Sequence, residues 1–349
     1  MSLKEKITPI DKYIDEALYS KKSGYYMKAN PFGKKGDYIT APNISILFSE
    51  IIAIWIVLFW KELKSPSKFN LVELGSGNGE MILQICKTLE KFPFIQKSCS
   101  ISIFEKSSYL KKIQKKKLKK YKIRWLNHLT DLPNFPTIYI ANEFFDALPI
   151  KQFIKKKKKW FERNIKFSKS SKAKILDLLT TVKKLESKVG FKISSGQKFI
   201  EFSPLSLKYL KYISKSIKLN NGGLLIIDYG YLDKQMKNTL KSISKHKFND
   251  VLENFGKSDI SHDLNFKLIE KIVNMLGLKV NGITSQKYFL EKLGILERAE
   301  IISKDVPFSE KANIYFRLKK LIDINEMGHL FKVMFVTKKN MNFKTGFQN

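Results

Sequence analysis

A glycine-rich turn at residues 75–79 constrains the fold of this chain more than any other feature. The turn, Gly-Ser-Gly-Asn-Gly, follows the apolar run Leu71–Leu74 and leads into a segment with apolar residues at helical spacing. A strand, a tight glycine turn and a helix, in that order, begin a nucleotide-binding α/β unit. The sequence therefore predicts a Rossmann-like α/β fold with a ligand at this turn.

The spacing of the glycines narrows the class of ligand. It is G-x-G-x-G rather than the dinucleotide pattern G-x-G-x-x-G, and no G-K-[ST] follows that would hold phosphates. Glu73, just before the turn, would repel a pyrophosphate but suits a cationic ligand. Enzymes that use S-adenosylmethionine (SAM) have E-x-G-x-G-x-G after a strand, where glycines let the backbone approach the cofactor. The pattern indicates a SAM site, although a turn that only joins a strand to a helix would have the same sequence.

The net charge of this 349-residue chain is +33, which by itself suggests nucleic acid or an anionic membrane as a partner. Only four of its 65 basic residues are arginine, and the lysines are spread along the whole sequence. A protein that reads nucleic acid would more often use arginine for bidentate contacts. We therefore interpret the charge as a solvated lysine surface and do not expect a nucleic-acid partner.

The cysteine content indicates a reducing compartment, and the hydropathy indicates that no segment spans a membrane. Cys86 and Cys99 are the only cysteines and do not form a C-x-x-C pair. The longest apolar run, Ile51–Trp60, is shorter than the about 20 residues that span a bilayer. The first residues contain no secretory signal, so we expect a bacterial cytoplasmic protein without a transmembrane segment.

Strands and helices continue to alternate beyond the turn. Four further segments are predicted to be strands: Ile101–Phe104, Ile123–Leu126, Thr137–Ala141 and Gly222–Asp228. This alternation predicts a mostly parallel, doubly wound sheet. A ligand of such a sheet lies outside the carboxyl ends of the strands, where the glycine turn, Glu105 and Asn142–Asp146 all fall.

Two further parts of a SAM site are expected near these strand ends. Glu105, at the end of the second strand, would accept hydrogen bonds from the ribose hydroxyls, unless it only opens the next helix. The adenine would be held by the region Leu126–Leu132, in which we single out no residue.

Three regions are expected along the chain. Residues 1–66 form an N-terminal helical region, with helices at Pro9–Leu18 and Leu47–Leu63 joined by a loop rich in Gly, Asp, Thr and Pro. Residues 67–349 form the core. Residues 150–220 are inserted in it as a hairpin around Lys155–Lys159, followed over residues 170–220 by helices with a strand-to-helix corner at Phe199–Pro204. A phosphate-binding role for these lysines is the weaker interpretation.

Longer motifs resemble one known family. They are G-D-Y-I-T-A-P (36–42), V-E-L-G-S-G-N-G (72–79), A-N-E-F-F-D-A-L-P (141–149), I-D-Y-G-Y (227–231), S-D-I-S-H-D-L-N-F (258–266), F-L-E-K-L-G-I-L-E-R-A (289–299) and M-G-H-L-F-K-V (327–333). With them, nearly the whole chain resembles the MidA-like methyltransferases, a family that includes a mitochondrial complex I assembly factor that methylates an arginine. The resemblance implies a class I SAM-dependent methyltransferase fold with an N-terminal helical part and an inserted lid, and SAM as the cofactor.

The resemblance also implies roles for individual residues. Cofactor contacts are implied for Gly36, Asp37, Thr40, Glu73, Gly75, Gly77, Gly79 and Glu105. Contacts with the methyl acceptor, and hence catalytic roles, are implied for Asn142, Glu143 and Asp146. No metal is expected. The chain departs from the family where Asn43 replaces a common glutamate, and where Ser76 and Asn78 replace a common proline and arginine. No role of that arginine is therefore expected here.

The chemistry of arginine methylation agrees with this assignment. A guanidinium is a poor nucleophile because it stays protonated, with a pKa of about 12 or higher. The carboxylates of Glu143 and Asp146, three residues apart after a strand end, would hold and orient its outer nitrogens. Alternatively, Glu143 caps the next helix and Asp146 pairs with a lysine.

We expect a SAM-dependent protein arginine methyltransferase whose substrate is a subunit of the respiratory NADH dehydrogenase (complex I), methylated during assembly. Two other hypotheses remain open. A non-catalytic assembly chaperone would keep the fold and bind SAM. A nucleic-acid methyltransferase is favoured only by the charge, because the [DNS]-P-P-[YFW] turn of adenine-methylating enzymes is missing after the fourth strand.

Overall fold

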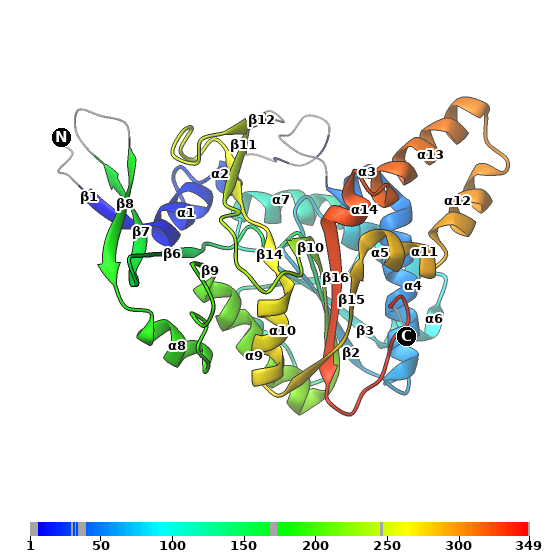
Figure 1. Cartoon of the computed structure of the whole chain (residues 1–349). Coiled ribbons are helices and arrows are strands. Elements are labelled where there is room, and N and C mark those ends of the chain that lie inside the picture. The colour runs from blue at the N-terminus through cyan, green and yellow to red at the C-terminus, as the bar shows by residue number, and fades with distance from the viewer. Residues whose placement is uncertain are drawn as a thin grey trace.

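A computed structural model describes residues 6–28, 31, 33, 40–167, 173–244 and 247–347 of the chain. Within these residues the centre is an eight-stranded sheet, ordered β15-β16-β10-β5-β2-β3-β4, with β14 paired to β10 (Figure 1). Its strands are β2 (Phe69–Leu74), β3 (Cys99–Phe104), β4 (Ile123–Leu126), β5 (Thr137–Asn142), β10 (Gly222–Tyr231), β14 (Leu264–Asn265), β15 (Leu278–Ser285) and β16 (Phe331–Lys338).

The direction of the strands confirms the predicted sheet. β4, β3, β2, β5 and β10 are parallel neighbours in that order. β16 runs antiparallel to both β10 and β15. The glycine turn therefore follows the central strand β2, and the ends of β2, β3, β5 and β10 meet at one edge of the sheet.

Both faces of the sheet are buried, because successive side chains of a strand point to opposite faces. Phe69 and Leu71 of β2 belong to one core cluster, whereas Val72 and Leu74 belong to the other. β5 and β10 divide their side chains between the same two clusters. The arrangement is the doubly wound one that the alternation of strands and helices predicted.

The helices of the sheet layers and termini are α1 (Ile10–Tyr19), α2 (Tyr25–Lys28), α3 (Ala41–Ile44), α4 (Ile46–Glu62), α5 (Glu80–Leu89), α6 (Pro93–Ser98), α7 (Ser108–Lys117), α9 (Pro204–Asn220), α10 (Phe266–Met275), α11 (Gln286–Lys292), α12 (Ile295–Ser303), α13 (Phe308–Ile322) and α14 (Met327–Leu330). The helices predicted at Pro9–Leu18, at Leu47–Leu63 and after the glycine turn are confirmed as α1, α4 and α5, with small shifts at their ends, and other helices, such as α2, α3, α6, α13 and α14, were not predicted. A short 3₁₀ turn, η1, spans Leu129–Asp131.

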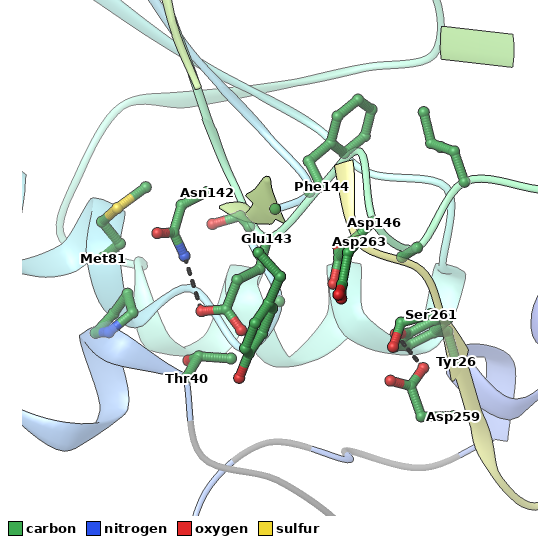
Figure 2. A pocket seen from close by; sticks show the side chains of 18 of the residues that line it. Tyr26, Thr40, Met81, Asn142, Glu143, Phe144, Asp146, Asp259, Ser261 and Asp263 are labelled. Atoms are coloured by element: carbon green, nitrogen blue, oxygen red, sulfur yellow. Dashed lines mark hydrogen bonds between the residues drawn. The ribbon is translucent and has the colours of Figure 1, made fainter. Parts of the chain in front are cut away.

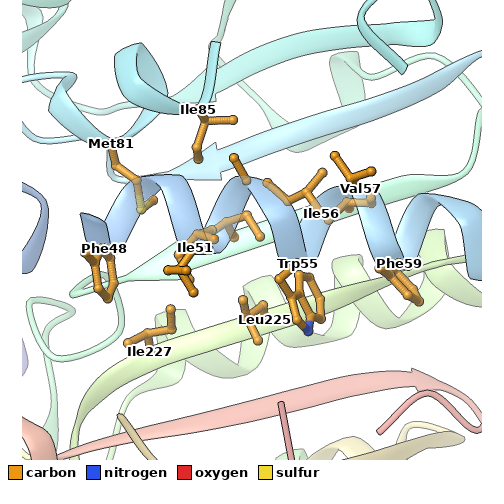
Figure 3. Close-up of a cluster of buried hydrophobic side chains, with 14 of the residues drawn as sticks. Phe48, Ile51, Trp55, Ile56, Val57, Phe59, Met81, Ile85, Leu225 and Ile227 are labelled. Carbon is orange, nitrogen blue, oxygen red and sulfur yellow. The ribbon is translucent and has the colours of Figure 1, made fainter. Parts of the chain in front are cut away.

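Helix α4 is apolar on almost all sides because protein surrounds it. Figure 3 shows its Trp55 side chain turned toward the sheet, where Leu225 and Ile227 of β10 lie, while Met81 and Ile85 of α5 face the opposite side of the helix. Trp55 is fully buried. The apolar run that is too short for a membrane span is thus a core helix. Within the described ranges, no helix is long and apolar enough to cross a membrane.

The insertion differs in part from the prediction. The lysine-rich hairpin is confirmed as β6 (Lys151–Lys156) and β7 (Lys159–Phe167), with Lys157 and Lys158 both at positive φ in the tight turn. The helices predicted over residues 170–220 are confirmed in part, as the short helix α8 (Lys183–Val189) and as α9. The strand-to-helix corner predicted at residues 199–204 is also confirmed, because β9 (Phe199–Phe202) pairs with β6 and leads into α9 at Pro204. The strand β8 (Lys174–Thr180), which pairs with β7, was not predicted. β1 (Lys6–Pro9), also unpredicted, pairs with β7, so the N-terminal region completes this sheet.

A third sheet, of strands β11 (Lys241–Ser244), β12 (Lys247–Asn249) and β13 (Asp259–Ser261), follows β10 in the chain. In Figure 1 it lies above the central sheet, between the insertion sheet at the left and α12–α13 at the right. Its position matters because it borders the cavity described next.

Candidate active site

A cavity of about 850 Å³ lies at the carboxyl ends of β2, β3, β5 and β10. Its lining includes residues of the glycine turn, Glu105, the segment after β5 and the end of β10. Tyr19, Tyr26 and Thr40 from the N-terminal region complete the wall. The sequence predicted a ligand at this edge of the sheet, and the described residues do enclose a space there.

The glycine turn has a backbone that residues with side chains rarely adopt. Gly75, Gly77 and Gly79 have φ values of 69°, 52° and 78°. A Cβ on Gly75 would lie 2.8 Å from Cδ2 of Phe144, so a side chain there would collide with the cavity wall. Gly75 and Gly77 line the cavity, whereas Gly79 only shapes the start of α5. The turn thus offers bare backbone to a ligand, as a SAM site requires.

The two acidic residues beside the turn are buried and held by protein donors. The Ser76 hydroxyl donates to Glu73 Oε2 at 2.5 Å. The backbone N–H of Ser107 donates to Glu105 Oε1 at 2.8 Å, and the Gln114 amide donates to Glu105 Oε2 at 3.2 Å. Burial raises the pKa of both glutamates to about 7, against these hydrogen bonds, which lower it. A cationic group in the cavity would favour their ionised forms.

Gln114 is a positioning residue that the sequence analysis missed. It is fully buried on α7, and its amide nitrogen also donates to the carbonyl of Gly77 at 2.8 Å. Its amide oxygen accepts from Trp125 Nε1 at 2.9 Å. One side chain therefore ties the glycine turn to Glu105. No sequence signal marks it, because a glutamine on a lysine-covered helix is ordinarily a surface residue.

The N-terminal region contacts the glycine turn through two residues, Asn43 and Asn78, at which the sequence departs from the family that it resembles. Asn43 donates to the Thr40 hydroxyl at 2.7 Å, and Asn78 donates to Asn43 Oδ1 at 2.8 Å. Both departures thus fall in a single contact. Thr40 lines the cavity, and its predicted contact with the cofactor stays a prediction. Gly36 and Asp37 lie outside the described residues, so their predicted roles stay predictions.

Glu143 leaves β5 in a strained backbone conformation. Its φ is 50°, in the left-handed region that residues other than glycine rarely adopt, at a typical cost of about 1–3 kcal/mol. Its N–H donates to the carbonyl of Ile227 at 3.0 Å, which holds the turn against β10. Figure 2 shows its carboxylate beside Asn142, whose amide nitrogen donates to it at 3.2 Å. Burial raises the pKa of Glu143 to about 7. Glu143 does not cap a helix, because no helix begins after β5.

Asp146 is held in place by a second carboxylate. The backbone N–H groups of Phe145 and Asp146 both donate to Asp228 Oδ2, at 3.1 and 3.3 Å. Asp228 is fully buried and does not line the cavity, so it is structural. Asp146 does line the cavity, yet its Oδ1 is buried and accepts no hydrogen bond. Burial and the nearby Glu143 both raise its pKa.

Other residues that line the cavity come from distant segments of the chain. The sequence did not predict a place in the site for them or gave them no role. Tyr26 donates to Asp259 Oδ1 at 2.7 Å, and Lys241 contacts Asp263 Oδ1 at 2.5 Å (Figure 2 labels the two aspartates). The Lys241 ammonium also lies 4.7 Å from the ring centre of Tyr229. Asp259 and Asp263 belong to the motif at residues 258–266, and this motif was the feature of the sequence that could have placed them in the site.

No residue of Leu126–Leu132, the region expected to hold the adenine, lines the cavity, and its role stays a prediction. Leu126 and Leu129 pack in the core, and the Leu129 carbonyl accepts from Tyr212 at 2.6 Å, which turns this segment away. The apolar wall beside Glu105 is instead made by Phe104, Phe144 and Tyr209. The Phe104 and Tyr209 rings lie 5.4 Å apart in an edge-to-face arrangement.

The cavity is acidic although the protein is strongly basic. Carboxylates in its lining are those of Glu73, Glu80, Glu105, Glu143, Asp146, Asp233, Asp259 and Asp263. Three lysines also line it, and each already has a partner: Lys106 with Asp15, Lys241 with Asp263, and Lys332 with the carbonyl of His329. Among the described residues, no group of three or more His, Cys, Asp or Glu side chains could hold a metal ion. The arrangement suits a cationic ligand.

Known proteins similar to this chain are methyltransferases. A family model described as "Putative S-adenosyl-L-methionine-dependent methyltransferase" matches residues 51–284. The Drosophila melanogaster protein named protein arginine methyltransferase NDUFAF7 homolog, mitochondrial, is 29% identical over 354 residues, covering 93% of this chain and 80% of the relative. The human protein arginine methyltransferase NDUFAF7, mitochondrial, is 28% identical over 347 residues, covering 92% and 78%.

The fold is also that of a solved structure. A Burkholderia thailandensis protein, crystallised with S-adenosyl-homocysteine bound, superposes with a TM-score of 0.80 at 22% identity. The superposition covers 98% of this chain and 89% of that protein. The N-terminal region and the insertion therefore belong to the shared fold together with the central sheet.

Proposed function

This chain belongs to the family of S-adenosyl-L-methionine-dependent methyltransferases, and we propose that it methylates an arginine side chain of a protein. SAM supplies a methyl group on a positively charged sulfur. The observation that carries the acceptor assignment is the pair of carboxylates, Glu143 and Asp146, at the end of β5 in an acidic cavity. Relatives named protein arginine methyltransferases support the same acceptor.

In this proposal the cofactor is held by Thr40, Glu73, the glycine turn and Glu105. Bare backbone at Gly75 and Gly77 accommodates its amino-acid part, and Glu105 accepts from the ribose hydroxyls. The rings of Phe104 and Tyr209 provide an apolar wall for the adenine. Gly36 and Asp37 remain candidates for closing the loop over the cofactor.

The acceptor is held by oxygens that the protein itself leaves unpaired. A guanidinium carries five N–H donors in a plane, and Asp146 Oδ1 and Asn142 Oδ1 are buried without a donor. Glu143 and Asp146 would bind the two outer nitrogens and leave one aligned with the methyl group. As the nitrogen–methyl bond forms, the sulfur–methyl bond of SAM would break, S-adenosyl-homocysteine would leave, and the nitrogen would lose a proton. Carboxylates whose pKa values are raised by burial are suited to accept it.

The substrate we propose is a subunit of the respiratory NADH dehydrogenase, methylated during assembly in a bacterial cytoplasm, as the resemblance to the MidA-like family implies. A nucleic-acid substrate is disfavoured because the carboxylates that line the cavity would repel phosphates. A non-catalytic chaperone would not need the strained Glu143 backbone or the buried oxygens of Asn142 and Asp146 that lack a donor.

Labelled SAM tests the proposal. The purified protein is incubated with methyl-labelled SAM and an extract of cells that lack the gene, and the labelled material is hydrolysed for amino-acid analysis. We expect methylarginine in a respiratory NADH dehydrogenase subunit. Label in RNA, or in another amino acid, would contradict the arginine assignment. Binding of SAM without any transfer would favour the chaperone.

A further inference from the structure

We propose that three apolar side chains around the mouth of the cavity bind the protein substrate beside its methylated residue. This apolar rim consists of Leu232, Phe248 and Leu330. All three line the cavity, and they are exposed by 39%, 77% and 52%, respectively. The proposal rests on the proposed function, because it presupposes that the methyl acceptor is a protein.

The rim is assembled from three separate parts of the chain. Leu232 follows β10, Phe248 lies on β12, and Leu330 ends α14. Single exposed apolar residues are common on protein surfaces and need no explanation. Three that converge on the opening of one acidic cavity form a surface where an apolar group can bind.

The rim borders the acceptor side of the cavity. Phe248 pairs across the β11–β12 hairpin with Ile243, and Ile243 pairs on its other side with Asp259. Asp259 is close enough to raise the pKa values of Glu143 and Asp146 by its charge. Leu330 is followed by Phe331, whose ring centre lies 4.0 Å from that of Tyr229, another lining residue.

The apolar rim and the acidic interior together indicate which kind of substrate binds at the cavity. Carboxylates inside the cavity attract a cationic side chain, and the lining lysines are already paired. A free amino acid enclosed by the cavity would leave the rim in water. A protein segment whose arginine enters the cavity would cover it with neighbouring residues. We therefore infer a substrate segment with an apolar side chain within a few residues of the methylated arginine.

The rim is tested with the double variant Phe248→Ala/Leu330→Ala. Both side chains are exposed, so their truncation should leave the fold intact. Phe94→Ala is the matched control, because Phe94 is 83% exposed on α6 and does not line the cavity. Transfer from labelled SAM to extract protein is measured over a range of extract concentrations, and binding of S-adenosyl-homocysteine is measured by calorimetry.

We expect the double variant to label protein about fivefold more slowly at low extract concentration. The rate should recover at high concentration, with S-adenosyl-homocysteine affinity unchanged. The single variant Phe248→Leu keeps an apolar side chain at this position. It should therefore label protein at most of the rate of the unaltered enzyme. If the double variant labels protein at the same rate as Phe94→Ala, the apolar rim does not bind the substrate. The proposed function would not be affected by that result. If the unaltered enzyme labels no protein at all, the proposed function fails and the rim fails with it.

Discussion

The proposed function divides the cavity into a cofactor half and an acceptor half, and the two satisfy their polar groups in opposite ways. In the cofactor half, Glu73 and Glu105 accept hydrogen bonds from Ser76, Gln114 and the backbone of Ser107. In the acceptor half, one oxygen of Asn142 and one of Asp146 are buried without a donor. An unpaired buried polar atom typically costs about 1–3 kcal/mol. The cofactor half is therefore complete as folded, whereas the acceptor half fits a ligand rich in N–H groups.

The largest effect we expect is on the acceptor half. Glu143→Gln keeps the size of the side chain but removes its charge, so methyl transfer should fall about 1000-fold, as when a charge-stabilising group is lost. Affinity for S-adenosyl-homocysteine should change by less than about threefold. Radiometric transfer and calorimetry measure the two quantities. Glu300→Gln, on the exposed side of α12, is the control and should match the unaltered enzyme. If Glu143→Gln instead loses affinity for S-adenosyl-homocysteine, Glu143 contacts the cofactor rather than the methyl acceptor.

A smaller effect is expected on the cofactor half. Gly75→Ala places a Cβ 2.8 Å from Phe144, so S-adenosyl-homocysteine should bind about 100-fold more weakly. Gly196→Ala separates this collision from backbone strain. Gly196 has nearly the same φ, 70° against 69°, but nothing lies within 4 Å of its added Cβ. Gly75→Ala should lose more stability than Gly196→Ala, because it adds the collision to the same backbone strain, and only Gly75→Ala should lose calorimetric affinity. Equal affinities would show that the turn does not contact the cofactor.

The smallest effect concerns pH and spans both halves. Burial raises the pKa values of Glu73, Glu105 and Glu143 from 4.5 to about 7. Between these values the folded protein binds more protons than the unfolded chain, so its free energy of unfolding falls as pH rises. We expect the ligand-free Tm to drop by about 3 °C or more between about pH 5 and 8. Thermal scans should show a shallower drop for Glu143→Gln, and SAM should stabilise the protein more at the higher pH. A Tm that rises over this range would contradict the assigned burial.

The sequence predicted the central sheet well, and a cavity lies at the sheet edge where it predicted a ligand, because both depend on local patterns. Apolar runs and glycines identify β2 and its turn, and the ends of parallel strands must meet. The contacts of Gln114 and of Tyr26 with Asp259 could not be predicted, since they join segments that only the folded chain brings together. β8 was missed for a related reason. Its pairing with β7 decides the conformation of Lys174–Thr180, a segment with little pattern of its own.

The contact between Asn43 and Asn78 limits how this part of the chain can change. The resemblance to the MidA-like family implies glutamate at the first position and arginine at the second, and opposite charges at this separation would form an ion pair. Two neutral amides bonded at 2.8 Å replace such a pair without leaving a lone charge. Changing only one partner back would set a charge against an amide at the cofactor turn. The two positions are therefore expected to evolve together, and the neutral version should hold the loop equally well in dilute and in concentrated salt.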